Sequence, residues 1–140
     1  MRNSTVDILI EKNGKILLIT RNKSVFIGKK AIPGGRVDEN ETIEQAAERE
    51  AREETGLEVI PKEILGVYSD PKRDPREQYI STVFICEIKE GELKAGNDAS
   101  EAEWFELNEI NEDEMAFDHF KIIQDYKKWK NKKSTYWSTK

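Results

Sequence analysis

Three glutamates lie on one face of a predicted helix, at a spacing that suits metal-binding chemistry. On a helix with about 100° per residue, Ile43 and the alanines at 46 and 47 begin an apolar face. Glu50, Glu53 and Glu54 continue that face at i, i+3 and i+4. Carboxylates this close repel one another unless they are protonated or bind a cation. All-oxygen ligands favour a hard ion, Mg²⁺ or Mn²⁺, whereas the simpler interpretation is a solvated acidic surface helix.

The residues around this stretch mark where the helix begins and ends. Thr42 and Gln45 fit an S/T-x-x-E/Q capping box, so the helix is predicted to begin near Ile43. Gly56 stands one residue past the predicted end, where a left-handed conformation is favoured. Before the helix, the Pro-Gly-Gly turn at 33–35 lets the backbone approach a ligand without intervening side chains. A bare backbone loop beside an acidic helix suits a diphosphate bridged by metal ions.

The residues that flank the acidic cluster form a known motif. They match the Nudix box, G-x5-E-x7-R-E-U-x-E-E-x-G-U, at every fixed position, where U is an aliphatic residue and the first U here is a small one. The matching residues are Gly35, Glu41, Arg49, Glu50, Ala51, Glu53, Glu54, Gly56 and Leu57. The chain therefore closely resembles a Nudix hydrolase.

The resemblance implies a role for each charged residue of the box. Nudix proteins hydrolyse diphosphates linked to another group, commonly a nucleoside. The three clustered glutamates are the expected metal ligands, joined by the Gly35 carbonyl. Arg49 would lie beside the acidic face and orient it through charge-assisted hydrogen bonds, and Glu41 would anchor the loop to the helix.

The implied hydrolysis also needs a base that removes a proton from the attacking water. Bound ions would position this water and lower its pKa. Glu53 is one candidate base, and a carboxylate from a loop outside the box is the other. The acidic stretch before Trp104 supplies Asp98, Glu101 and Glu103, of which Glu101 is our candidate. A charged turn is the simpler interpretation of that stretch.

A segment after the box bears on the substrate. Residues 66–76 resemble the region that follows the box in short, single-domain ADP-ribose pyrophosphatases. In that segment Arg73 and Arg76 are fork donors suited to phosphate or ribose oxygens, although a solvated basic turn is the alternative. We also expect Asp74, in the same segment, and Arg21, earlier in the chain, to contact the substrate.

A second local match lies ahead of the last predicted helix. The Ala-Phe-Asp-His stretch at 116–119 resembles the AFDH motif of the same group. This resemblance would let Phe117 stack on adenine and would place His119, the only histidine, near the site. A surface histidine at a helix start is the alternative.

Two departures from the group's pattern concern the substrate. Family members often have an aromatic residue three positions before the proline of the Pro-Gly-Gly turn, where this chain has Lys30. Glu77 and Gln78 stand where the ADP-ribose group often has Gly and His. An acid at that position could repel phosphate or reshape the loop.

Composition restricts the class of protein. A chain of 140 residues can form one domain, here 1–140, with a sizeable core, and one cysteine excludes an internal disulfide and a zinc cluster. The N-terminus lacks the pattern of a signal peptide, and no aliphatic run approaches membrane-spanning length. We therefore expect a cytoplasmic protein without membrane contacts. The net charge of −5 argues against stable binding of nucleic acid, so the expected partner is a small nucleotide.

The remaining pattern predicts the elements that position the acidic helix. Val6, Ile8 and Ile10 alternate as in a half-buried strand, and Asn13-Gly14 predicts a hairpin into a central strand at 15–21 that is apolar on both faces. Further strands are predicted at 59–68, 79–89 and 103–107, with a loop at 22–30 and a last helix at 118–130. Strands around one helix, closed by another, predict an α/β fold of the α/β/α sandwich type with a mixed sheet, which the Nudix resemblance also implies.

The last predicted feature is a basic C-terminal tail at about 127–140, which contains six lysines and no acid. We interpret it as a solubilising tail whose aromatics pack on the domain; binding of single-stranded nucleic acid is the alternative. ADP-ribose pyrophosphatases that resemble this chain are often homodimers. The expected exposed apolar contacts of such a dimer are Phe26, Ile27, Trp129 and Trp137, and a monomer is the alternative.

Together these features predict a Mg²⁺-dependent Nudix hydrolase that cleaves ADP-ribose to AMP and ribose 5-phosphate. The alternative in the same class is a nucleoside-triphosphate pyrophosphatase for oxidised or non-standard nucleotides. The alternative in a different class is a non-catalytic, Nudix-like nucleotide sensor. The complete box argues against a sensor, because a binding protein has no need of every metal carboxylate.

Overall fold

A mixed sheet of eight strands forms the frame of the computed structural model, which describes residues 3–94 and 99–140. The strands are β1 (Ser4–Lys12), β2 (Lys15–Arg21), β3 (Lys30–Ala31), β4 (Gly34–Arg36), β5 (Leu57–Tyr68), β6 (Ile80–Gly91), β7 (Ala99–Glu106) and β8 (Tyr136–Trp137). The helices are α1 (Ile43–Thr55) and α2 (His119–Asn131), with short 3-10 helices at Leu107–Glu109 and Glu112–Glu114. The main strand order is β3-β2-β1-β6-β5-β8, while β4 pairs with β1 and β7 pairs with β2.

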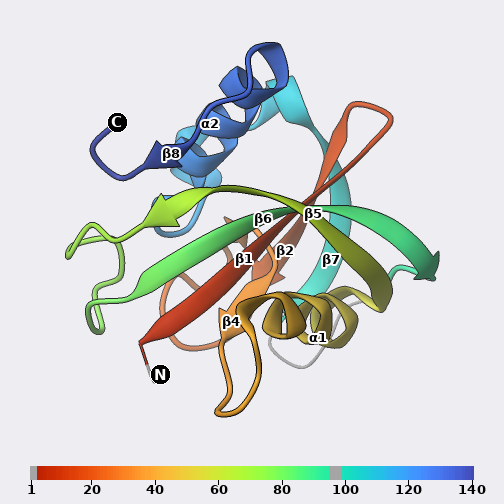
Figure 1. The fold of residues 1–140 in the computed structure, drawn as a ribbon, viewed down its shortest axis with the longest axis horizontal. Coiled ribbons are helices and arrows are strands. Elements are labelled where there is room, and N and C mark those ends of the chain that lie inside the picture. Colours follow the sequence, from red (N-terminus) through yellow and green to blue (C-terminus); the bar gives the residue numbers. More distant parts are fainter. Residues whose placement is uncertain (1–2, 95–98) are drawn as a thin grey trace.

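The two helices lie on opposite faces of this sheet (Figure 1). Strands β1 and β6 run parallel, as do β5 and β8, whereas the other pairs are antiparallel. One buried cluster includes Ile122 and Ile123 of α2, and a second includes Ala46 and Ala47 of α1. The structure confirms the predicted α/β/α sandwich with a mixed sheet. Among the residues that it describes, neither helix has the length and apolar character needed to cross a membrane.

The N-terminal hairpin forms as predicted. Asn13 and Gly14 have φ values of 53° and 78°, the positive angles that a tight two-residue turn requires. In β2, Leu17 packs in the cluster beside α1, whereas Ile16 and Leu18 pack in the cluster beside α2. This strand is therefore buried on both faces, as its continuous apolar run predicted.

Local signals also set both ends of α1. The Thr42 hydroxyl accepts a hydrogen bond from the Gln45 amide at 3.1 Å, and the Gln45 side chain accepts one from the Thr42 amide at 2.8 Å. The helix begins at Ile43 and ends before Gly56, whose φ is 79°. Alanines at 46, 47 and 51 are fully buried and let α1 lie close to the sheet.

Several strand ends differ from the prediction because pairing sets them. Strand β5 begins two residues early, at Leu57, because Leu57 and Glu58 pair with β6. Strand β7 begins at Ala99 rather than at 103 because it pairs along β2 as far as Arg21. The predicted Pro-Gly-Gly turn overlaps β4, and a Cβ atom on Gly34 would lie 2.1 Å from the Val6 carbonyl oxygen. Glycine is therefore required for β4 to pair with β1.

Residues 127–140, which we interpreted as a basic tail, include the end of α2 and the short strand β8. Helix α2 continues to Asn131, and Tyr136–Trp137 form β8 beside β5. Trp129 is partly buried and stacks on Tyr126, with ring centroids 6.0 Å apart. Tyr136 is buried in the core, so most of the aromatic surface packs on the domain as we interpreted it.

Candidate active site

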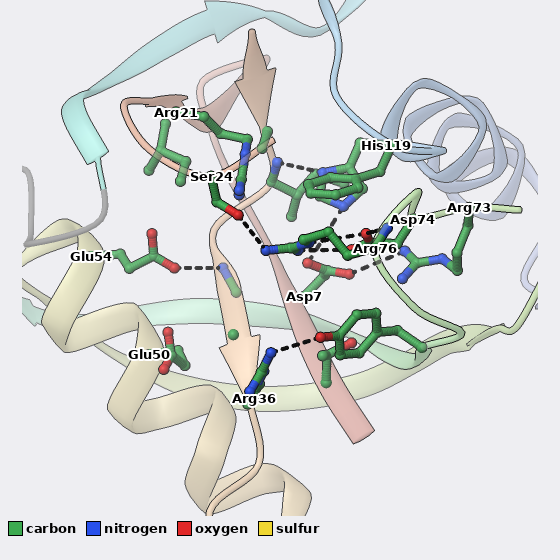
Figure 2. A pocket seen from close by; sticks show the side chains of 18 of the residues that line it. Asp7, Arg21, Ser24, Arg36, Glu50, Glu54, Arg73, Asp74, Arg76 and His119 are labelled. Atoms are coloured by element: carbon green, nitrogen blue, oxygen red, sulfur yellow. Dashed lines mark hydrogen bonds and ion pairs between the residues drawn. The ribbon is translucent and has the colours of Figure 1, made fainter. Parts of the chain in front are cut away.

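A pocket of about 360 Å³ lies where the Pro-Gly-Gly loop, α1 and the loop of residues 69–79 meet (Figure 2). The latter loop joins β5 to β6 and is called the β5–β6 loop below. Most of the residues expected at the site line this pocket: Arg21, Gly35, Glu50, Glu54, Arg73, Asp74, Arg76, Phe117 and His119. Arg49, Glu53 and Glu101 do not line it.

The acidic wall of the pocket comes from α1 and the glycine loop. Glu54 is only 4% exposed, and its carboxylate accepts a hydrogen bond from the Gly34 amide at 3.0 Å. The Glu50 carboxylate lies so close to Gly35 that a Cβ atom there would be 2.3 Å from it. The two carboxylates therefore lie directly beside bare backbone, as the box predicted.

These groups have the chemistry of a site for a hard cation. Glu50, Glu54 and the backbone at Gly35 offer oxygen donors, which Mg²⁺ and Mn²⁺ prefer. Burial raises the pKa of Glu50 and Arg49 opposes that shift. A bound cation would stabilise the buried anion further. In the part of the chain that the structure describes, however, no three Asp, Glu, His or Cys side chains converge on one point.

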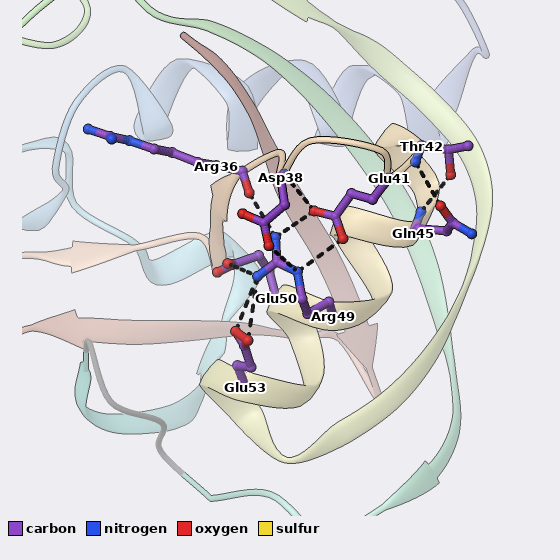
Figure 3. Close-up of polar contacts among 8 residues, drawn as sticks. All are labelled: Arg36, Asp38, Glu41, Thr42, Gln45, Arg49, Glu50 and Glu53. Carbon is purple, nitrogen blue, oxygen red and sulfur yellow. Dashed lines mark hydrogen bonds and ion pairs between the residues drawn. The ribbon is translucent and has the colours of Figure 1, made fainter. Parts of the chain in front are cut away.

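Arg49 contacts both Glu50 and Glu53, the third glutamate of the cluster (Figure 3). Its Nη1 donates to Glu50 at 2.6 Å and to the half-exposed Glu53 at 3.2 Å, outside the pocket. Its Nη2 donates to Glu41 at 2.7 Å and to the Arg36 carbonyl at 2.8 Å. The hydrogen bond from Arg49 lowers the pKa of Glu41. This arginine therefore joins the acidic face of α1 to the loop before the helix.

The structure does not bring the other candidate base into the pocket. Glu101 is exposed on β7, opposite Thr20 of β2. Its hydrogen bond and charge raise the pKa of the neighbouring Glu103. Asp98 lies outside the described residues.

The β5–β6 loop supplies the cationic wall. Arg76 donates to the Asp74 carboxylate at 3.1 and 2.8 Å and to the Ser24 hydroxyl at 2.9 Å. Burial acts to raise the pKa of Asp74, but its bonds with Arg76 outweigh burial and lower it. Arg73 is buried, and both of its fork nitrogens donate to Asp118, at 3.0 and 2.8 Å. Both arginines line the pocket. The side chain of Arg73 connects the loop to the start of α2, whereas that of Arg76 is held by Asp74 and Ser24.

Phe117 lies with its ring beside the guanidinium groups of Arg21 and Arg76. Its φ is 54°, an uncommon left-handed value for a bulky residue. The guanidinium carbons of Arg21 and Arg76 lie 4.8 and 6.0 Å from its ring centroid. Phe26 packs edge-on against the same ring at 4.9 Å. Phe26 is thus partly buried by a contact within the chain, and its expected place in a dimer contact stays a prediction.

His119 is buried at the floor of the pocket. Its Nδ1 accepts a hydrogen bond from the Ile32 amide at 2.9 Å, and its Nε2 lies 3.6 Å from the Asp7 carboxylate. Burial lowers the pKa of His119 despite the nearby Asp7. Because Nδ1 is an acceptor, the neutral ring carries its proton on Nε2, facing Asp7. The alternative of a surface histidine is therefore excluded, and His119 lies at the pocket as expected.

Several lining residues were not expected at the site from the sequence, among them Asp7, Arg36 and Tyr79. Asp7 is a buried acid between two apolar positions of β1, and the Ser81 hydroxyl donates to it. Arg36 directly follows Gly35 and donates a hydrogen bond to the Tyr79 hydroxyl at 2.7 Å. The signal for Asp7 was a charge inside an apolar strand, whereas the Arg36–Tyr79 contact spans 43 residues and leaves no local pattern.

The departures from the group's pattern lie away from the pocket lining. The Lys30 ammonium lies 5.2 Å from the Phe105 ring, outside the pocket. Glu77 and Gln78 are exposed on the β5–β6 loop and do not line the pocket. The charge of Glu77 nevertheless acts on the cationic wall, since it helps to raise the pKa of Arg76.

Comparisons with known proteins agree with this geometry. The NUDIX domain family model matches residues 1–126. An ADP-ribose pyrophosphatase of Methanocaldococcus jannaschii is 57% identical over 126 residues, which cover 90% of this chain and 73% of that protein.

Solved structures share the fold over most of this chain. A MutT/nudix family protein from Enterococcus faecalis has a TM-score of 0.79 at 31% identity, covering 94% of this chain and 63% of that one. A bifunctional NMN adenylyltransferase/ADP ribose pyrophosphatase from Francisella tularensis, complexed with AMP and a Mn ion, has a TM-score of 0.81 at 28% identity, covering 91% of this chain and 42% of that one. This chain thus spans less than two thirds of each of these two structures. By its family match, its fold and its complete box, the chain belongs to the Nudix family.

Proposed function

We propose that this protein is a divalent-metal-dependent hydrolase that cleaves ADP-ribose to AMP and ribose 5-phosphate. The observation that carries the proposal is one pocket with two unlike walls. Glu50, Glu54 and the glycine loop form an oxygen-rich wall, and Arg76 and Phe117 belong to a cationic, aromatic wall. The name of the M. jannaschii relative, which is 57% identical over 126 residues, supports ADP-ribose as the substrate.

The acidic wall would hold the cation through Glu50, Glu54 and the Gly35 carbonyl. When bound, Mg²⁺ or Mn²⁺ supplies charge neutralisation of the diphosphate and a water of lowered pKa. Arg49 holds the Glu50 carboxylate in place at 2.6 Å. Glu53 stays our candidate for accepting the proton of the attacking water, although its half-exposed carboxylate lies beside Arg49 and outside the pocket lining.

The opposite wall would hold the nucleotide. The ring of Phe117 offers a flat surface for adenine, with the Arg21 guanidinium over it. Asp74 fixes the fork of Arg76 by two hydrogen bonds, so this cation is oriented before an anionic substrate arrives. The neutral ring of His119 keeps the floor in place between β1 and the glycine loop.

A substrate panel tests this proposal. The purified protein is incubated with ADP-ribose, other nucleotide sugars, dinucleotides and triphosphates, with Mg²⁺ or Mn²⁺, and products are separated by chromatography. We expect AMP and ribose 5-phosphate from ADP-ribose, and no products in excess chelator. A strong preference for triphosphates would establish the pyrophosphatase alternative instead. Tight nucleotide binding without turnover would establish a sensor.

We also propose that the protein forms a homodimer. Ile27 and Trp137 are 66% and 48% exposed, and Ile64, Val67 and Ile80 are further large apolar side chains on the surface. Val67 and Trp137 are direct neighbours in the pairing of β5 with β8, and a contiguous exposed apolar surface favours a contact with another molecule. Light scattering at micromolar concentration tests this, since a mass near 16.2 kDa rather than twice that value means a monomer.

A further inference from the structure

The C-terminal segment lies beyond the region that matches the Nudix family, yet it packs against the base of the β5–β6 loop. The family match ends at residue 126. In the structure, Tyr136 and Trp137 pair in parallel with Gly66 and Val67 of β5. A Cβ atom on Gly66 would lie 2.0 Å from the Tyr136 carbonyl oxygen, so the two backbones are in direct contact.

Ser138 continues this contact into the β5–β6 loop. Its hydroxyl oxygen accepts hydrogen bonds from two successive amides, Ser69 at 2.8 Å and Asp70 at 3.0 Å. A hydroxyl oxygen has two lone pairs, so one side chain can hold both amides. These amides are the first two of the loop, where the chain leaves β5.

A chain of hydrogen bonds connects Ser69 and Asp70 to the cationic wall. The Asp70 carbonyl accepts a hydrogen bond from the Arg73 amide at 3.0 Å, and the Arg73 side chain is fixed on Asp118. The adjacent Asp74 accepts hydrogen bonds from the amide and the guanidinium of Arg76. The loop is therefore held at its start by Ser138 and at its middle by α2.

We propose that Ser138 is a positioning residue for the substrate, which acts through the β5–β6 loop and Arg76. This inference rests on the proposed function, because it assumes that Arg76 contacts the substrate. Ser138 itself does not line the pocket. Its loss would free the two amides at the start of the loop and widen the range of positions of Arg76.

The first test measures the loop without any substrate. In hydrogen exchange followed by mass spectrometry, the peptide that contains the Ser69 and Asp70 amides should exchange about tenfold faster in Ser138→Ala than in the wild type. Ser138→Thr keeps the hydroxyl and should exchange like the wild type. Thr139→Ala is the matched control, because this neighbouring exposed hydroxyl makes no hydrogen bond among the described residues.

The second test separates positioning from folding. Ser138→Ala should raise KM for ADP-ribose about three- to tenfold, with kcat within about twofold, because hydrogen bonds of this kind have modest individual effects. The melting temperature should change little, and Ser138→Thr should restore KM. Thr139→Ala should match the wild type in every measurement.

The outcomes are distinguishable. Unchanged exchange in Ser138→Ala overturns the anchoring role, and faster exchange with an unchanged KM overturns the positioning role. A large fall in melting temperature with no selective change in KM assigns Ser138 to folding alone and also overturns the proposal. If the wild type does not hydrolyse ADP-ribose, the proposed substrate is wrong, while the exchange comparison still decides whether Ser138 anchors the loop.

Discussion

At the scale of single residues, Glu54 tests the metal chemistry most directly. It is a buried carboxylate that accepts the Gly34 amide. Glu54→Gln keeps an oxygen acceptor of the same shape but removes the charge that a cation needs. We expect turnover of ADP-ribose to fall by orders of magnitude in steady-state kinetics. Glu44→Gln, in the exposed first turn of the same helix, is the control and should be fully active.

Metal binding should also be visible without turnover. A ligand that binds only the native state raises the free energy of unfolding by mass action. Millimolar Mg²⁺ or Mn²⁺ should therefore raise the melting temperature of the wild type and of Glu44→Gln. The rise should be much smaller in Glu54→Gln. Equal shifts in all three proteins would mean that the ions bind elsewhere.

Arg36 was not expected at the site from the sequence, but we predict that its substitution lowers kcat/KM for the substrate. Its guanidinium lies 5.5 Å from the Tyr79 ring and donates to the Tyr79 hydroxyl. Unlike Arg73 and Arg76, Arg36 forms no ion pair among the described residues, so its charge is available to a substrate phosphate. Arg36→Gln should lower kcat/KM by a factor that corresponds to a loss of about 1–3 kcal/mol of transition-state binding.

Kinetics on two further variants check this expectation. Arg36→Lys keeps the charge but loses the planar fork, so its kcat/KM should fall between the wild type and Arg36→Gln. Tyr79→Phe removes only the hydroxyl that holds the fork and should have a smaller effect than Arg36→Gln. Wild-type kcat/KM in Arg36→Gln would exclude contact between this arginine and the substrate.

At the scale of elements, the pairing of β8 with β5 depends on one glycine. Gly66 faces the Tyr136 backbone so closely that a methyl group would overlap it. Gly66→Ala should therefore displace β8 and cost about 1–3 kcal/mol of unfolding free energy, the usual range for overpacking. Val67→Ala, at a 43% exposed neighbour, should cost less. Urea denaturation measures both, and equal losses would show that β8 adds little stability.

The elements that sequence alone could define were those with local signals. The start of helix α1 was predicted near Ile43, where the helix begins, because the hydrogen bonds between Thr42 and Gln45 are local. Strand β7 was predicted too short because its pairing with β2, far away in sequence, decides where it begins. Strands β4 and β8 have only three and two residues, too few for a hydrophobic period.

The same distinction applies to the site. Gly35, Glu50 and Glu54 belong to one contiguous motif, so the sequence could place them together. Whether Arg73 points to the substrate or to Asp118 depends on α2, 45 residues later, and no spacing rule contains that choice. Glu101 was expected by its charge alone, which does not fix the face of a strand.

At the scale of the whole molecule, His119 joins three separate parts of the fold. It begins α2, accepts the Ile32 amide that precedes the glycine loop, and faces Asp7 of β1. Asp7 and Asp118 act to raise the pKa of His119, and Arg73 and Arg21 act to lower it, but burial is the largest effect and lowers it. The folded protein therefore keeps this ring neutral at a pH where the unfolded chain binds a proton.

The sign of the resulting pH dependence follows from linkage. Above the ordinary histidine pKa of about 6.5 the ring is neutral in both states, and its contribution to stability is complete. As pH falls below that value, only the unfolded chain takes up the proton, so the free energy of unfolding falls until the lower folded pKa is reached. The slope from this one group is at most about 1.4 kcal/mol per pH unit.

His119→Asn tests this dependence, because the amide oxygen of Asn can still accept the Ile32 amide but does not titrate. We expect the wild type to lose stability in urea denaturation between about pH 7 and pH 5.5, and the variant to lose less over the same range. No other histidine exists in the sequence, and Glu50, whose pKa burial raises, titrates in both proteins and cancels in the comparison. The variant's lower absolute stability does not affect the slope. Parallel stability curves for the two proteins would show that His119 is not held neutral by the fold.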